Sequence, residues 1–307
     1  MIASLFKTSS FFSYLLSIAI LAAVVFIKGE TRQNFFGFET EQSIALLLLS
    51  CCMLAVDWAV KKHYWAKQAN FHLLLFPLFV FALPISSWHN WMLMFLFFFW
   101  IAFSYLVAIN QSGGTITKVF NAFFFFFMGC LFFPQGVILL PLLWLIILIK
   151  GVLSLQSFFV STLPIVALLL LEVVIVYFFP NRAIFPAVDF STIVFSRPWE
   201  PLFRSNLWRI ILVVLFLVAL FKHYFDMGTK SASYGTGMIA MFVTTAAGIL
   251  FGLAFQSQSY FAWIFFLMPL TALATHVFEE IKRTWLRELF FLGIIALLLI
   301  GKQGLLG

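Results

Sequence analysis

The chain has 307 residues, of which 64% are hydrophobic and only 9% are charged, with a formal net charge of +7. A soluble domain carries about 25% charged residues, so this chain has too few to cover a water-facing surface. Its apolar runs are continuous rather than alternating, which excludes the strand pattern of a membrane β-barrel. The composition therefore predicts helices that use lipid as their solvent.

The excess of basic residues does not indicate a nucleic-acid partner, because the lysines and arginines lie in the links between apolar runs. No basic stripe with interleaved aromatic residues is visible outside those runs. Phosphate-binding loops, metalloprotease motifs and nucleophile elbows are also missing from the sequence. We therefore expect no nucleic acid, no cofactor and no metal site.

Windowed hydropathy predicts about eleven transmembrane helices, within a range of about ten to twelve. The first is interpreted as a retained helix rather than a signal peptide, because no small-residue cleavage site follows it. The predicted fold is an all-α polytopic transmembrane helix bundle, with one integral-membrane domain over residues 1–307. The segments are 11–27, 44–60, 71–85, 91–109, 119–133, 136–149, 159–179, 207–221, 237–255, 260–278 and 286–300.

The distribution of basic residues predicts an N-terminus on the cytoplasmic side. The link after the second helix carries Lys61, Lys62 and Lys67, whereas several short links on the opposite side carry none. Cytoplasmic links are the ones enriched in lysine and arginine. The longest extramembrane loop, residues 180–206, is then expected on the outer side of the membrane.

The opening MIASLFKTSSFFSYLL, the stretch from Phe120 to Pro141 and the Ser161–Pro164 start of a helix resemble an uncharacterised multi-pass membrane protein family of the Bacteroidota. The similarity extends over most of the chain. The resemblance implies a location in the bacterial inner membrane, which would make the 180–206 loop periplasmic. It implies no established activity.

Glu172 lies near the middle of the predicted 159–179 helix. A charged side chain at mid-bilayer costs about 2.5–3.5 kcal/mol on insertion scales, so it normally faces the bundle interior. We interpret Glu172 as a candidate proton or cation relay or a contact to a polar substrate. The alternative is a protonated carboxyl that hydrogen-bonds a neighbouring helix.

Two further ionisable residues near helix ends have simpler interpretations. Asp57 lies one turn before Lys61, so an i,i+4 ion pair or snorkelling towards the interface accounts for it. His276 precedes a mixed-charge link and suits interfacial anchoring, with a gate as the alternative.

The 180–206 loop and the following turn gather arginines beside aromatic residues and prolines. Arginine grips phosphate through its planar fork, so these residues suit a phosphate or pyrophosphate lipid headgroup. An interfacial belt of snorkelling arginines and anchoring tryptophans is the alternative. The candidate contact residues are Arg182, Arg197, Arg204, Arg209, Asp189 and Glu200.

A GxxxG spacing between Gly248 and Gly252 predicts close helix packing, within the chain or in a homodimer. Other homo- or hetero-oligomers are left open.

We expect a non-catalytic envelope role: a transporter-like or partner-assembly protein that handles a lipid or lipid-linked substrate, with membrane lipid as its surroundings. One alternative is a membrane-embedded transferase or polymerase of lipid-linked glycans, with Glu39, Glu41 or Asp189 as base. The other is a structural subunit of an envelope complex.

Overall fold

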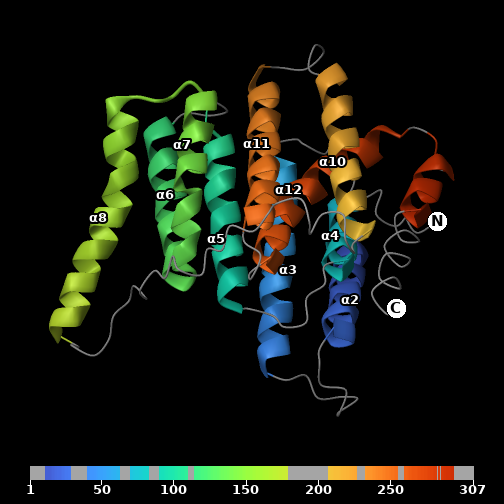
Figure 1. The fold of residues 1–307 in the computed structure, drawn as a ribbon, viewed down its shortest axis with the longest axis horizontal. Coiled ribbons are helices and arrows are strands. Elements are labelled where there is room, and N and C mark those ends of the chain that lie inside the picture. Colours follow the sequence, from blue (N-terminus) through green and yellow to red (C-terminus); the bar gives the residue numbers. More distant parts are fainter. Residues whose placement is uncertain are drawn as a thin grey trace. The chain divides into compact units, whose positions relative to one another are not determined.

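The computed structural model describes residues 11–28, 40–62, 70–82, 90–109, 114–178, 207–226, 232–254, 259–281, 283 and 285–293. Throughout these residues the regular structure is helical, which confirms the predicted all-α class (Figure 1). The helices are α2 (Phe11–Lys28), α3 (Thr40–Lys62), α4 (Phe71–Ala82), α5 (Asn90–Val107), α6 (Thr115–Phe132), the 3₁₀ helix η1 (Pro134–Leu139), α7 (Leu140–Ile149), α8 (Leu155–Phe178), α10 (Leu207–Asp226), α11 (Ala232–Ala254) and α12 (Ser259–Glu280). A further helix covers 285–293.

Each apolar segment predicted from the sequence overlaps one of these helices, while residues 83–85, 179, 255 and 294–300 of those segments lie outside the described part. Continuous apolar runs become helices in lipid because a helix satisfies all its backbone hydrogen bonds internally. In the described part, 4 helices are long and apolar enough to cross a membrane. They cover Gln42–Lys62, Asn90–Val107, Thr115–Phe132 and Leu155–Phe178.

Two of the predicted segments, 71–85 and 136–149, are weak because proline interrupts them, and their described residues are helical too. Pro77 lies inside α4, and the helix continues through it to Ala82. Proline is tolerated in apolar helices where neighbouring helices support the freed backbone group. The second weak segment begins with the 3₁₀ helix η1, which starts at Pro134, and α7 follows it directly.

The chain divides into two compact units, and α11 contributes to both. The second unit consists of residues 89–192 and 231–240, and the first of the rest of the chain. In the second unit, α5 and α8 both pack near α6, and α7 packs against α5 (Figure 1). The expectation of one membrane domain over residues 1–307 stays a prediction.

The first unit is organised around α4 and α12. Helix α12 packs against α4, α10 and α3, while α2 packs against α3 and α4. The short α4 is buried along most of its length, including Phe71, Phe76 and Phe79. This central position brings His72, the polar side chain of α4, into contact with α3.

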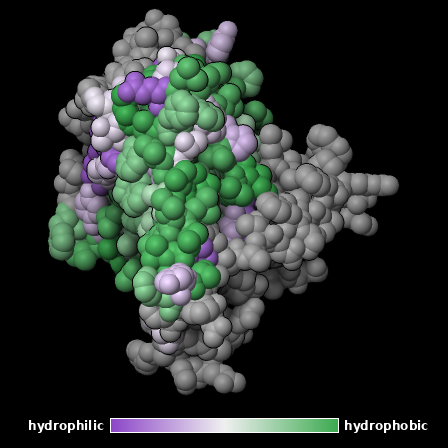
Figure 2. Space-filling view, turned by 90° about the vertical axis from the view of Figure 1, so that its left-hand side faces the viewer, coloured by the Kyte–Doolittle hydropathy of each residue, from purple (hydrophilic) through white to green (hydrophobic). Residues whose placement is uncertain are grey.

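Large apolar side chains are exposed on the outside of several helices. Helix α8 shows this most clearly, with Leu170, Val173 and Tyr177 among its exposed residues. The face on which α8 lies in front is mainly hydrophobic (Figure 2). A soluble monomer rarely exposes so large an apolar surface, whereas a lipid-facing surface requires one. The structure is therefore that of a polytopic membrane helix bundle.

Candidate functional site

Asp57 is directed into the first unit by its position on α3. Met53, four residues before it, and Val60, three residues after it, are fully buried, and Asp57 itself is only 9% exposed. Residues three and four apart share a helix face, so the carboxylate is held where its neighbours are apolar. A buried carboxylate is costly unless it is paired and hydrogen-bonded.

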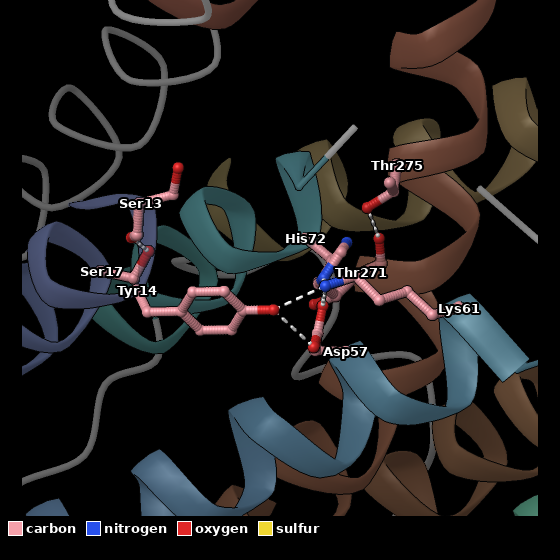
Figure 3. Close-up of polar contacts among 8 residues, drawn as sticks. All are labelled: Ser13, Tyr14, Ser17, Asp57, Lys61, His72, Thr271 and Thr275. Atoms are coloured by element: carbon pink, nitrogen blue, oxygen red, sulfur yellow. Dashed lines mark hydrogen bonds and ion pairs between the residues drawn. The ribbon is translucent and has the colours of Figure 1, made fainter. Parts of the chain in front are cut away.

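The structure provides those partners from three helices (Figure 3). The Oδ1 atom of Asp57 lies 2.6 Å from Nε2 of His72 on α4 and 2.8 Å from Nζ of Lys61 on α3. The Tyr14 hydroxyl on α2 donates to Oδ2 at 2.9 Å, and the Lys61 ammonium donates to the Tyr14 oxygen. Both carboxylate oxygens are thus engaged. We call Tyr14, Asp57, Lys61 and His72 the carboxylate cluster.

His72 is the most deeply buried member of the cluster, with 1% of its surface exposed. An ionised carboxylate only accepts hydrogen bonds, so Nε2 of His72 carries the proton that faces Asp57. In the neutral ring Nδ1 is then an acceptor, and it is buried without a hydrogen-bond partner. A second proton would turn Nδ1 into a donor.

Beside the His72 ring, the cluster contains one negative side chain, Asp57, and one positive side chain, Lys61. Asp57 and Lys61 balance each other, and the Lys61 side chain is 43% exposed, so its charge remains partly in contact with the surroundings. A protonated His72 would donate from Nε2 to the Asp57 carboxylate and would present a second N–H at Nδ1. The arrangement therefore suits reversible proton binding at the Asp57–His72 pair.

Helix α12 adds hydroxyl groups on the side of the cluster next to His72. Thr271 and Thr275 are fully buried and stand one turn apart (Figure 3). Each donates to a backbone carbonyl one turn earlier, at 2.7 Å. Their oxygens keep acceptor capacity, so this surface remains polar inside an apolar bundle.

The sequence-based candidate site residues that the structure describes are not members of the carboxylate cluster. Glu172 is half-buried on α8, in the second unit. Gly248 is buried on α11, as close helix packing requires, and Gly252 lies one turn further on the same helix. Arg209 is in the first turn of α10, and its side chain is outside the described part. Outside the described residues lie Glu39, Arg182, Asp189, Arg197, Glu200 and Arg204.

Sequence reasoning found half of the carboxylate cluster. The predicted i,i+4 ion pair between Asp57 and Lys61 is confirmed, but Asp57 is not merely snorkelling. Tyr14 and His72 were missed because only the packing of α2 and α4 against α3 brings them to Asp57. The available signal was a histidine inside an apolar run, which normally requires a polar partner.

The second unit contains a buried cation of a different kind. Lys150 follows α7, is 4% exposed, and donates to the Thr236 hydroxyl at 3.3 Å. Burial lowers the pKa of Lys150 from 10.5 to about 8. Among the described residues, no group of three or more histidine, cysteine, aspartate or glutamate side chains is placed to hold a metal ion.

Comparison with known proteins gives a family but no activity. No curated protein and no solved structure matches the chain. The sequence profile of a family of unknown function, DUF6427, matches residues 1–303. The chain therefore belongs to the DUF6427 family.

Proposed function

We propose that this chain is a proton-coupled, transporter-like protein in which the Asp57–His72 pair binds the coupling proton. The observation that carries the proposal is the buried Asp57 carboxylate, shared by side chains of α2, α3 and α4. Ionisable groups inside membrane bundles are expensive, and they commonly mark ion pathways or proton relays. A purely structural contact between helices would need only neutral hydrogen bonds.

The groups around the pair determine when the proton is bound. Tyr14 of α2 and Lys61 of α3 contact Asp57 directly, while α12 carries His276 and Glu279 on the helix that packs against α3 and α4. Histidine ordinarily titrates near pH 6.5, within the physiological range. Because Asp57 contacts Tyr14 of α2 as well as His72 of α4, a change in the charge of the pair would alter the contacts among three helices.

The cellular setting follows from the sequence. The resemblance to a Bacteroidota family supports the bacterial inner membrane and a role in the cell envelope. The bias of basic residues supports a cytoplasmic N-terminus. The arginines of the 180–206 loop support a lipid or lipid-linked substrate, because arginine suits phosphate groups.

The proposal can be tested with the full chain reconstituted in lipid vesicles that contain a fluorescent pH indicator. Under an imposed pH gradient, protons should enter wild-type vesicles faster than vesicles that hold Asp57→Asn or His72→Gln. Glu172→Gln serves as the matched variant, because it neutralises a carboxylate on a different helix. Equal proton entry for wild type and Asp57→Asn would contradict the proposal. So would a loss seen only with Glu172→Gln, since the coupling proton would then belong to α8.

A further inference from the structure

Buried polar atoms without hydrogen-bond partners gather around the beginning of α4. Asn70, immediately before the helix, is fully buried, and neither its amide nitrogen nor its amide oxygen has a partner. Two residues later, Nδ1 of His72 is also buried without a hydrogen-bond partner. Buried polar groups are nearly always hydrogen-bonded, so orphaned atoms on neighbouring residues call for an explanation.

A buried arginine lies against the first residue of α4, Phe71. Arg287, on the 285–293 helix, is 9% exposed, and its guanidinium carbon lies 5.1 Å from the ring centre of Phe71. One terminal nitrogen donates to the Ile281 carbonyl at 2.6 Å, while Nε is buried without a partner. The described carboxylates form no ion pair with it within 4.0 Å. Phe71 follows Asn70 directly in the sequence, so its contact with Arg287 brings the guanidinium to the beginning of α4.

The beginning of α4 favours negative charge as well. Asn70 accepts the first helical hydrogen bond, from the Leu73 amide at 3.0 Å, which places it at the N-cap. The side-chain oxygen of an N-cap asparagine usually accepts a hydrogen bond from a backbone amide of the first turn, but the Asn70 oxygen has no hydrogen-bond partner. Helix N-termini carry a partial positive charge and bind anions.

These observations point to a single kind of ligand. A buried cation is costly without a counter-ion, and guanidinium binds oxyanions through parallel hydrogen bonds. We infer that Arg287, the Asn70 amide and Nδ1 of His72 form a binding site for an oxyanion, a phosphate or sulfate group. The inference rests on the proposed function and extends it: the substrate carried with the proton bears an anionic oxygen group.

His72 links proton binding to anion binding chemically. Its Nε2 faces Asp57, and its Nδ1 is the unpartnered atom. Only the protonated ring can donate from Nδ1, so a proton bound at the Asp57–His72 pair adds a donor for the anion. Linkage is reciprocal, so the bound anion should in turn favour the proton.

Binding can be measured by thermal unfolding of the full chain in maltoside micelles, which contain no phosphate of their own. Inorganic phosphate should raise the unfolding temperature of the wild type, as any ligand of the native state does. Arg287→Gln should weaken phosphate binding about tenfold to a hundredfold, the loss expected for a charged hydrogen bond. Asn70→Ala should weaken it less. Arg283→Gln removes an exposed arginine just before the same helix and should bind as the wild type does.

A second arm identifies the source of the anion. Phosphatidylglycerol added to the micelles replaces inorganic phosphate as the probe. Stabilisation by the lipid but not by the salt supports a lipid headgroup, and the reverse supports a soluble anion. The site is refuted if neither probe stabilises the wild type, or if Arg287→Gln and Asn70→Ala both respond as the wild type does. Arg287→Lys keeps the charge and should recover part of the affinity, which distinguishes lost binding from lost folding.

The same titrations separate this inference from the proposed function. Sulfate keeps its charge across the range, so its affinity for the wild type should fall as the pH rises from about 5 to about 8. In Asp57→Asn sulfate should still bind, with a reduced dependence on pH. Binding that needs Arg287 but ignores pH would support the anion site and contradict proton coupling. Proton entry without any anion binding would support proton coupling and contradict the anion site.

Discussion

The two units stabilise apolar helices in different ways. In the second unit, the buried Phe95 ring lies 6.0, 6.2 and 5.8 Å from the rings of Phe99, Phe126 and Phe133. In the first unit, α2, α3 and α4 are joined by the hydrogen bonds and ion pairs of the carboxylate cluster. Lipid is as apolar as leucine, so burial alone cannot hold either unit together. Packing of complementary ring shapes holds the helices of the second unit together, whereas hydrogen bonds between side chains join the helices of the first unit.

This difference indicates where each unit can respond to its surroundings. Interlocked rings have no protonation state, and moving them creates voids or clashes. A carboxylate shared by three helices changes its contacts whenever it gains or loses a proton. We therefore expect changes in the second unit to act on stability, and changes at the cluster to act on proton binding.

The largest loss of stability is expected from Phe95→Ala. Its side chain is completely buried among aromatic rings, and truncation of such a residue costs about 3–5 kcal/mol. The free energy of unfolding can be measured in mixed micelles by titration with dodecyl sulfate, using tryptophan fluorescence. Proton entry into vesicles should persist. Phe124→Ala, at a ring that is 36% exposed, is the control and should cost far less. Similar losses for both variants would argue against a packed aromatic core.

Gly136→Ala tests the same core by adding side-chain volume instead of removing it. A Cβ atom at Gly136 would overlap the ring of Phe95, which the surrounding aromatic residues hold in place. Overpacking of this kind costs about 1–3 kcal/mol. The matched substitution is Gly235→Ala in α11, where a Cβ meets nothing within 4 Å. Unfolding curves should show destabilisation for Gly136→Ala only, and equal curves would mean that the ring moves freely.

Tyr14→Phe tests the hydrogen bonding of the first unit with the smallest possible change. It removes the hydroxyl that joins α2 to Asp57, and one such bond contributes about 0.5–1.5 kcal/mol. Ser17→Ala is the control, because the Ser17 hydroxyl donates to Ser13 within α2. Unfolding should be easier for Tyr14→Phe than for Ser17→Ala. The reverse order would show that bonds between helices contribute no more than bonds within one.

The fold could be predicted from the sequence because hydropathy over a helix length is a local property. The described residues of each apolar segment are helical over most of their length, and even Pro77 did not break α4. The Asp57–Lys61 pair was predictable for the same reason, since one helical turn fixes the spacing. His72 lies 15 residues from Asp57 and Tyr14 lies 43 away. Only helix packing joins them, and a uniformly apolar sequence contains no signal for which faces meet.

The interior position of a charge was equally hard to predict. Glu172 stands in the middle of an apolar run, whereas Asp57 stands near the end of one with a lysine beside it. Position along the helix made Glu172 the stronger candidate. In the structure, Asp57 is the more buried of the two, because α2 and α4 cover that end of α3.

The smallest predicted effect concerns Lys150, the buried cation of the second unit. Its pKa is about 8 in the folded chain against an ordinary 10.5, so the unfolded chain holds one more proton between these values. Stability should therefore rise with pH across that window, and Lys150→Met should lack this increment. Leu148→Met, an uncharged and exposed neighbour, controls for the new side chain. Thermal unfolding at both ends of the window measures the difference.

Lys150 also gives the contrast between the units its most direct test. With a pKa of about 8, this lysine stays largely protonated between about pH 5 and about pH 7, where histidine titrates. Lys150→Met should consequently leave proton uptake in that range unchanged, while His72→Gln removes part of it. A soluble indicator dye can follow both variants in micelles. If Lys150→Met removed as much uptake as His72→Gln, proton binding would not be confined to the first unit.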